Sequence, residues 1–169
     1  GDLLAEGTQR ASKKIPGSEM FVVTVKGQEY PMHEPRLKRG LGIGYAISPT
    51  GADHVHSIHD TLATGADSDG LQAMELARQL GIVEPLPVED LSPRKARLTL
   101  YKQQNTIADN CISFCIFVPW TVEEKAAIVR AATGWDVTSY ELQKVGERAQ
   151  NLARVFNARE GFGIDDDRL

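Results

Sequence analysis

The sequence predicts an all-α fold, a multihelical bundle with one minor β-hairpin. Thr-x-x-Glu capping boxes stand at residues 121–124 and 138–141, and each one opens a helical pattern. Ser92-Pro93 is typical of a helix start, because serine caps well and proline suits the first helical position. The second capping box precedes an apolar stripe at spacings of three and four, formed by Leu142, Val145, Ala149, Leu152 and Phe156. This stripe predicts a helix with one buried face.

The N-terminal region predicts one short helix followed by the hairpin. The helix covers residues 2–14 and ends before Pro16-Gly17. The β-branched and aromatic residues 21–25 form the first strand of the hairpin, and residues 28–30 form the second. Lys26-Gly27 between them is the expected turn. No other part of the chain carries a comparable β signal.

The middle of the chain alternates between helical and irregular patterns. Residues 36–47 predict a loosely packed helix, since its alternate glycines each lower helix propensity by about 1 kcal/mol relative to alanine. Residues 61–69 predict a loop, 70–80 a helix ended by glycine, and 84–91 an extended connector rich in proline. The helix that begins at Ser92-Pro93 reaches Cys111 or Ser113. Its middle is crowded with amides and other polar side chains, which indicates an exposed side or a polar contact.

Composition and charge limit the classes of protein to which the chain can belong. The chain has 169 residues, a net charge of −4, 41% hydrophobic and 25% charged residues, which is typical of an ordinary globular protein. The charge is mixed and carries no basic stripe, so a nucleic-acid partner is not expected. No apolar run approaches the roughly 20 residues that cross a bilayer, so no membrane partner is expected either. We assign residues 1–24 to the end of a preceding helical domain and 25–169 to a C-terminal helical domain, with residues 1–169 packing as one unit as the alternative.

Cysteine usage favours a reducing compartment. The chain contains two cysteines and no signal-peptide profile, so free thiols are expected before a disulfide. We therefore expect a cytoplasmic protein.

The segment 31–60 concentrates the groups that could carry chemistry. All four histidines of the chain lie in it, and alternate glycines at 40–44 allow something to approach the backbone closely. A turn at 48–51 then delivers His54 and His56 beside that segment. Such an arrangement can bring an acid–base group to a ligand. The alternative is a polar loop with solvated histidines.

The residue types alone also allow two other classes of protein. His59-Asp60 resembles the helical HD phosphohydrolases, with His33 and Asp109 as further metal ligands. The His54-x-His56 pair is similar to that of the amidohydrolases, which need a barrel that this chain cannot form. The non-enzymatic alternative is a helical interaction module with a partner surface formed by Arg148, Arg154 and Arg159.

Several motifs in a fixed order resemble one known family. The chain is similar to the C-terminal part of the tungsten-containing aldehyde ferredoxin oxidoreductases, and the resemblance covers nearly its whole length. The matching segments are Pro31-x-x-Glu34-Pro35-Arg36, Gly40-x-Gly42-x-Gly44-Tyr45-Ala46, Thr50-Gly51-x-x-His54, Cys115-x-Phe117, Ala132-Thr133-Gly134-Trp135-Asp136, Gly146-Glu147-Arg148 and Asn151-Leu152-x-Arg154-x-Phe156-Asn157.

The resemblance implies an enzyme that oxidises aldehydes to carboxylic acids with ferredoxin as electron acceptor. Its cofactors would be a tungstopterin, with tungsten or molybdenum held by two pterins, and a 4Fe–4S cluster. Because the chain starts at Gly1 inside a helical pattern, we expect an excised C-terminal fragment. Alone it should be inactive and hold neither cofactor. The implied partners are the N-terminal domains of the same protein, ferredoxin and an aldehyde, and the family also allows a homo-oligomer.

The resemblance assigns a role to individual residues. His54 corresponds to the histidine that assists proton transfer near the tungsten site, and His56 takes a position where the family usually has a lysine or arginine facing the pterin. Cys115 corresponds to the fourth thiolate of the cluster. In the family this cysteine ends an Asp-x-x-Gly-Leu-Cys stretch whose aspartate binds the pterin. Here Asn110 takes the aspartate position, and Asp109 could replace it through a one-residue bulge.

Two further cysteine and histidine assignments complete this set. Cys111 is expected to be a packing residue and His59 a surface residue without a role. If the family register is correct, His54 and Cys115 face the same side, together with Asn110 or Asp109 and an apolar patch left open by the absent domains. The polar middle of the helix from Ser92 would then line the cofactor.

Overall fold

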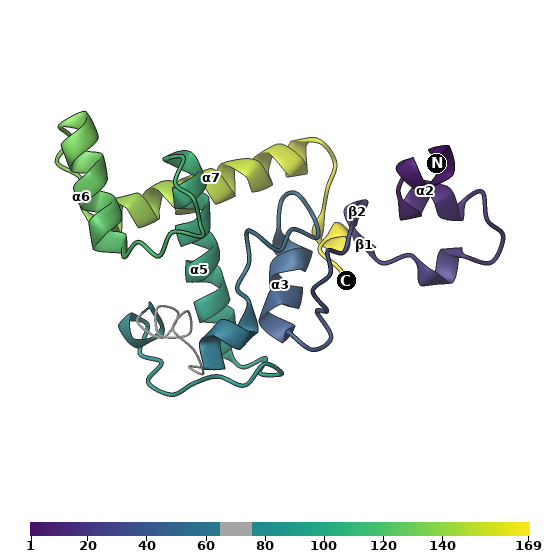
Figure 1. Ribbon diagram of the computed structural model, residues 1–169, viewed down its shortest axis with the longest axis horizontal. Helices are drawn as coiled ribbons and strands as arrows, with labels where there is room; N and C mark the ends of the chain where they lie inside the picture. Colours follow the sequence, from purple (N-terminus) through teal and green to yellow (C-terminus); the bar gives the residue numbers. More distant parts are fainter. Residues whose placement is uncertain (65–75) are drawn as a thin grey trace.

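The computed structural model describes residues 1–64 and 76–169. Its described residues are mainly α-helical with one two-stranded sheet, which confirms the predicted fold class. Helix α5 (Pro93–Cys111) runs through the middle of the molecule, with α3 (Arg39–Ile47) beside it and α7 (Ser139–Arg159) across its C-terminal half (Figure 1). Helix α6 (Val122–Thr133) packs against the first part of α7. No helix in these ranges is long and apolar enough to span a membrane.

The N-terminal segment forms two short helices instead of the predicted single one. These are α1 (Asp2–Ala5) and α2 (Thr8–Ser12), and Gly7 separates them with a φ of 80°, a conformation that ends a helix. A single 3₁₀ turn, η1 (Glu19–Phe21), follows. In Figure 1 this segment stands to one side of the other helices. A hydrogen bond from the Thr8 amide to the Glu29 carboxylate joins it to the hairpin, and the domain boundary after residue 24 stays a prediction.

The predicted hairpin is confirmed, although its strands are short. β1 (Thr24–Val25) pairs antiparallel with β2 (Gln28–Glu29). Lys26 and Gly27 both have positive φ values, 50° and 79°, as a two-residue type I′ turn requires. Val25 is only 1% exposed and packs into a small cluster with Leu41, Tyr45 and Ala52. The hairpin therefore covers one side of α3.

Helix α3 is tightly packed, contrary to the loose helix that its glycines predicted. It also begins at Arg39 and not at residue 36. A Cβ atom added at Gly44 would lie 1.6 Å from Ser57 Oγ and 2.4 Å from Ser57 Cβ. Glycine here permits a close approach between the helix and the histidine-bearing segment, and this contact was not visible as a local propensity.

The N-terminus of α3 is held by a buried carboxylate. Asp60 accepts hydrogen bonds from the backbone N–H groups of Gly40 (3.0 Å) and Leu41 (2.9 Å). The same carboxylate forms an ion pair with the Lys95 ammonium of α5, and both side chains are 0% exposed. A carboxylate at this position satisfies free N–H groups and complements the helix dipole. Asp60 thereby fixes α3, α5 and the segment after residue 53 to one another.

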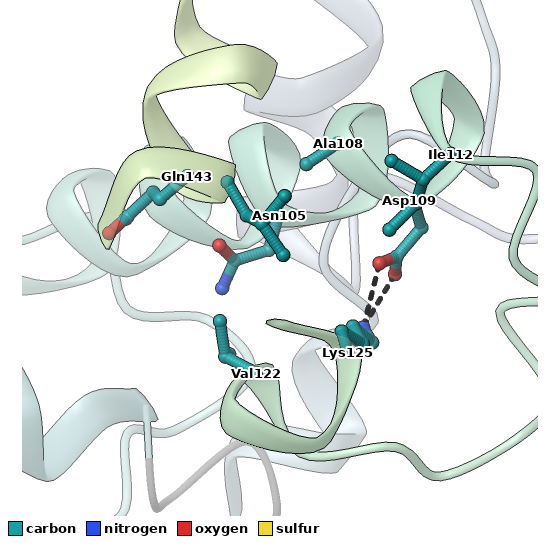
Figure 2. Close-up of a pocket in the computed structure, with 8 residues that line it drawn as sticks. Asn105, Ala108, Asp109, Ile112, Val122, Lys125 and Gln143 are labelled. Atoms are coloured by element: carbon teal, nitrogen blue, oxygen red, sulfur yellow. Dashed lines mark hydrogen bonds and ion pairs between the residues drawn. The ribbon is translucent and has the colours of Figure 1, made fainter. Parts of the chain in front are cut away.

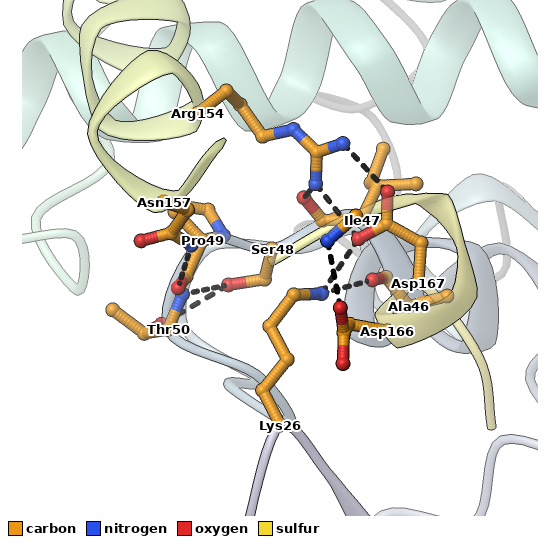
Figure 3. A network of polar contacts seen from close by, with 11 residues as sticks. Lys26, Ala46, Ile47, Ser48, Pro49, Thr50, Arg154, Asn157, Asp166 and Asp167 are labelled. Carbon is orange, nitrogen blue, oxygen red and sulfur yellow. Dashed lines mark hydrogen bonds and ion pairs between the residues drawn. The ribbon is translucent and has the colours of Figure 1, made fainter. Parts of the chain in front are cut away.

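The C-terminus of α3 is held by two cations. Lys26 donates to the Ala46 carbonyl (2.6 Å) and Arg154 of α7 donates to the Ile47 carbonyl (3.2 Å). Both also bind Asp167 near the end of the chain, Arg154 through two parallel hydrogen bonds (Figure 3). These bonds, those from Arg154 foremost, lower the pKa of Asp167 to about 2. Arg154 is therefore held by contacts within the chain, to Ile47 and Asp167, although its side chain is 39% exposed.

The segment between α3 and α5 agrees only in part with what the sequence predicted. The predicted loop at 61–69 begins with a 3₁₀ helix, η2 (Asp60–Thr64), and its remainder lies outside the described residues. Of the helix predicted at 70–80, residues 76–79 are helical, Gly81 follows with a φ of 75°, and the earlier residues are not described. Helix α5 begins at Pro93 as predicted. The Ser92 hydroxyl, however, donates to Asp90 instead of capping α5.

Both predicted capping boxes are present. The Thr121 hydroxyl accepts from the Glu124 N–H (3.2 Å), and the Thr138 hydroxyl accepts from the Glu141 N–H at the same distance. Gly134 ends α6 in the left-handed conformation. Local sequence alone specifies these helix ends, because each cap involves residues no more than a turn apart.

The predicted apolar stripe of α7 is buried only at its N-terminal end. Leu142 is 5% exposed and packs with Ala126 and Val129 of α6, whereas Leu152 and Phe156 are 71% and 62% exposed. The apolar interior is divided among three small clusters. The accessible surface is 10302 Å², against about 8,200 Å² expected for a compact monomer of this size. Much of the apolar surface of this fold is therefore left uncovered by the chain itself.

Candidate functional site

The structure brings together two of the residues predicted to bind cofactor. The Asn110 Nδ2 atom lies 2.9 Å from the Nε2 atom of His56, within hydrogen-bond distance. Asn110 is exposed one residue before the end of α5, and His56 is partly buried in the segment that follows α3. The two positions are far apart in sequence, so only the packing of α5 beside α3 creates the pair.

Asp53 stands behind this pair. Its Oδ2 atom lies 3.1 Å from His56 Nδ1, close enough for an ion pair although the two groups are not aligned for a good hydrogen bond. Its Oδ1 atom accepts from the Val55 N–H (2.8 Å), which fixes the carboxylate in the turn. A carboxylate beside Nδ1 favours a proton on that nitrogen and leaves Nε2 to accept from the Asn110 amide. The Asn110 amide oxygen is then free for another donor.

The other three histidines form a compact cluster next to the pair. The ring centroids of His33 and His59 are 4.5 Å apart, those of His33 and His54 are 5.0 Å apart, and those of His54 and His59 are 6.0 Å apart. Burial, reinforced by the Lys38 ammonium, lowers the pKa of His33 and lowers that of His59 to about 4. His59 is half-buried, so the prediction of a surface residue is wrong. His33 and His59 therefore stay neutral near pH 7.

The low pKa of His59 predicts a pH-dependent stability. Below about pH 6.5 the unfolded chain takes up a proton on His59 more readily than the folded chain does. The stabilising contribution is therefore complete above pH 6.5 and is lost as the pH falls towards about 4. Urea unfolding between about pH 7.5 and pH 5 should show a falling midpoint, and His59→Gln should flatten that fall. An unchanged pH slope in the variant would contradict the assignment.

Asp109 is engaged elsewhere and does not share the side of Asn110. It is 7% exposed, and its carboxylate forms an ion pair of 2.8 Å with Lys125 of α6 (Figure 2). Helix α5 continues without interruption through both residues to Cys111, so the bulge that would exchange them is absent. Asp109 is thus engaged by Lys125, whereas Asn110 is exposed beside His56.

Both cysteines are exposed free thiols. Cys111 is the last residue of α5, and the prediction that it packs in the interior is wrong. The chain then turns back, with Ser113 at a φ of 59° and the Phe114 N–H bonded to the Asp109 carbonyl (2.9 Å). Cys115 follows in this turn. Residues 116–120 after it include Phe117, which is 89% exposed, so apolar surface adjoins the thiol.

Gln103 and Gln104, in the polar middle of α5, pack against α7. Gln103 is 0% exposed, and its side-chain oxygen accepts from the Gln150 amide of α7 (2.7 Å). Gly146 of α7 lies so close that an added Cβ would stand 1.9 Å from the Gln104 carbonyl oxygen. The expectation that this whole stretch lines a cofactor is therefore wrong at its centre. Helix-to-helix contact explains its polarity.

The geometry does not support the metal-dependent phosphohydrolase. Asp60, the required aspartate, is buried in its ion pair with Lys95. Within residues 1–64 and 76–169 no group of three histidine, cysteine or carboxylate side chains is arranged to hold a metal ion. Asp109, the other proposed ligand, is paired with Lys125.

Two charged residues near the predicted site residues, Lys38 and Lys125, were not predicted from the sequence. Asp53 was considered with the histidines as a possible metal ligand, and the structure places it beside His56 instead. The Nζ atom of Lys38 lies 3.5 Å from His59 Nδ1. Asp53 stands three residues before His56, and this spacing is a local sequence signal from which their contact could be predicted. Lys38 and Lys125 meet their partners only through tertiary packing.

These features define an α-helical domain that groups several of the predicted site residues and leaves apolar surface exposed. Over residues 1–169 the chain matches the family profile described as aldehyde ferredoxin oxidoreductase, domains 2 & 3, and it belongs to that family.

Three curated relatives are similar to the chain, and each is named tungsten-containing aldehyde ferredoxin oxidoreductase. That of Pyrococcus horikoshii is 31% identical over all of this chain and 26% of its own length. That of Pyrococcus abyssi is 30% identical with the same coverage. That of Thermococcus kodakarensis is 28% identical over 96% of this chain and 24% of its own length. The chain thus spans about a quarter of the length of the curated relatives that it matches, and further domains of the same protein are implied.

Proposed function

We propose that this chain is the C-terminal part of a cytoplasmic enzyme that oxidises aldehydes to carboxylic acids and passes the electrons to ferredoxin. The observation that supports this proposal most directly is the 2.9 Å contact between His56 Nε2 and Asn110 Nδ2. The family register assigns both positions to the pterin, and residues with a shared ligand must lie close together in space. In the reaction an aldehyde and water give an acid, two electrons and two protons. The tungstopterin supplies the oxygen-transfer chemistry, and the protein supplies orientation and proton handling.

The residues present fit one face of such a cofactor site. A cluster held by thiolates requires four of them, and the whole chain contains two cysteines. Cys115, exposed in its turn, is suited to supply one thiolate while the rest of the protein supplies the others. Asn110 would hold a pterin N–H through its amide oxygen, in place of the carboxylate usual in the family. His56 keeps that amide oriented, because its Nε2 atom accepts the amide hydrogen.

His54 is proposed as the proton acceptor of the reaction. Its imidazole lies against those of His33 and His59, with ring centroids 5.0 and 6.0 Å away. A neutral ring nitrogen of His54 can take up a proton released as the aldehyde is oxidised. The contact between His56 and Asn110 supports the prediction that His54 and Cys115 face a common side, since each lies a few residues from one member of that pair. Substrate identity and the choice between tungsten and molybdenum depend on the other domains.

The full-length holoenzyme tests this function, and the two cysteines provide a matched pair of variants. We expect aldehyde-dependent reduction of ferredoxin by the parent protein. Cys115→Ser should lose most cluster iron and the cluster's paramagnetic resonance signal, because serine is a poor cluster ligand. Cys111→Ser, an equally exposed thiol four residues away, should keep both. Equal iron content in the two variants would refute the role of Cys115, and activity on phosphate esters without tungsten would refute the enzyme class.

Pterin retention tests the role of Asn110. In the full-length protein Asn110→Ala should lower the pterin content several-fold, since a buried cofactor loses one oriented hydrogen bond and His56 loses its partner. The measurement is the fluorescence of the oxidised pterin released per protein. Asn151→Ala, an exposed asparagine on α7, is the control and should retain the cofactor. Normal pterin content in Asn110→Ala would argue against the register.

A further inference from the structure

A pocket that includes none of His54, His56, Asn110 and Cys115 lies between α5, α6 and α7. It has a volume of about 460 Å³ and is lined by side chains of these three helices, of the segment before α6, and by Leu76 and Gln79. Trp120, Val122 and Tyr140 give it apolar and aromatic walls, and Asn105 and Gln143 give it two amides. Lys102 and Lys125 supply its cationic groups, and Glu123 its anionic one. The pocket is therefore amphipathic and large enough for a small organic molecule.

Two of these charged groups already have partners. Lys125 pairs with Asp109 at 2.8 Å, and Glu123 pairs with Arg130 at 3.0 Å (the first pair is seen in Figure 2). The Lys102 ammonium forms no hydrogen bond or ion pair with any residue in the described ranges. It is half-buried on α5, and the loss of water around it, together with the nearby Lys125 charge, lowers the pKa of its ammonium group. A bound anion would relieve both unfavourable effects.

We propose that this pocket binds a small monocarboxylate with an apolar body, its carboxylate on the Lys102 ammonium and its body against Trp120. A single unpaired cation matches a single negative charge. An inorganic phosphate dianion would leave one charge uncompensated and would place a strongly hydrated group against aromatic walls. The two amides can satisfy the remaining carboxylate lone pairs. The inference is independent of the proposed aldehyde chemistry, because it uses none of the residues assigned a role there.

Calorimetric titration of the chain, residues 1–169, with benzoate tests this proposal. Benzoate should bind the parent protein and should bind Lys102→Met at least about tenfold more weakly, since a charge-assisted contact is lost while the aliphatic stem remains. Lys13→Met removes an exposed lysine far from the pocket and should bind as the parent does. Benzyl alcohol, similar in shape but neutral, should bind at least about tenfold more weakly than benzoate.

Three outcomes would overturn the proposal. They are no benzoate binding by the parent, equal binding by Lys102→Met with unchanged circular dichroism, and tighter binding of inorganic phosphate than of benzoate. If Lys102→Met fails to fold, benzoate should protect Lys102 of the parent protein against reductive methylation several-fold while Lys13 reacts as before. Equal methylation of Lys102 with and without benzoate would then decide against the pocket.

Discussion

Replacing Gly146 with alanine is expected to destabilise the fold by about 3 kcal/mol, a large effect for one methyl group. The added Cβ would stand 1.9 Å from the Gln104 carbonyl oxygen and 2.9 Å from its carbon. These atoms belong to the backbone of α5, so no side chain can rotate away and the two helices must separate. Separation would also strain the buried hydrogen bond between Gln103 and Gln150. Urea unfolding followed by far-UV circular dichroism measures the loss.

Gly163→Ala is the matched control for this change. Gly163 lies near the C-terminal end, and an added Cβ there meets no atom within 4 Å. Its unfolding midpoint should stay within the scatter of the parent protein. A Gly146→Ala variant as stable as Gly163→Ala would show that α5 and α7 do not pack as closely as the structure describes.

Replacing Asp60 with asparagine is expected to cost about 3–5 kcal/mol, because it leaves the Lys95 ammonium buried and unpaired. Both side chains are 0% exposed, so water cannot replace the lost charge. The same carboxylate binds the Gly40 and Leu41 N–H groups at the start of α3. Loss of the charge should therefore loosen α3 from α5, and the histidine segment with it. Chemical denaturation of the variant provides the measurement.

Two further variants distinguish the effect of burial from the effect of the lost charge on stability. Asp165→Asn breaks an ion pair with Arg168 in which the carboxylate is 83% exposed, and it should change stability by less than about 1 kcal/mol. The double variant Asp60→Asn, Lys95→Met removes both charges and should be more stable than Asp60→Asn alone. Equal losses for Asp60→Asn and Asp165→Asn would mean that the Asp60 pair is not buried in solution.

The helix ends show which parts of the fold can be predicted. Residues 121–124 and 138–141 form their caps as expected because all the atoms involved lie within one turn of each other. The turn at Lys26-Gly27 is specified in the same local way. The single N-terminal helix was predicted wrongly because Gly7, inside the predicted range, adopts a positive φ that ends α1.

Periodicity identified the helix α7 but not how much of it is buried. Leu142 and Phe156 belong to one stripe, yet only the first meets a partner within this chain. A stripe specifies a face that prefers burial, and the neighbouring elements decide whether burial occurs. The exposed half is consistent with the quarter of the relatives' length that this chain represents.

The candidate site, too, could be predicted from the sequence only in part. Motifs in a fixed order were enough to place the chain in its family and to single out His54, His56, Asn110 and Cys115. They could not choose between Asn110 and Asp109, because neighbouring helical positions differ only in direction. In the structure Lys125 engages Asp109 and His56 contacts Asn110, and our proposal for Asn110 rests on these contacts.

By itself the sequence determined the helical class, the helix ends and the hairpin turn, because each depends on residues close together along the chain. It also determined the family, because several family motifs follow one another in the family's order. Only the tertiary structure decided that Gly44 of α3 meets Ser57 and that Asp60 is a buried structural carboxylate. It also decided that the Lys102 ammonium lines a pocket and has no partner among residues 1–64 and 76–169. Those properties depend on which segments far apart in the sequence come into contact. Such long-range contacts produce no periodic pattern of residue types from which they could be predicted.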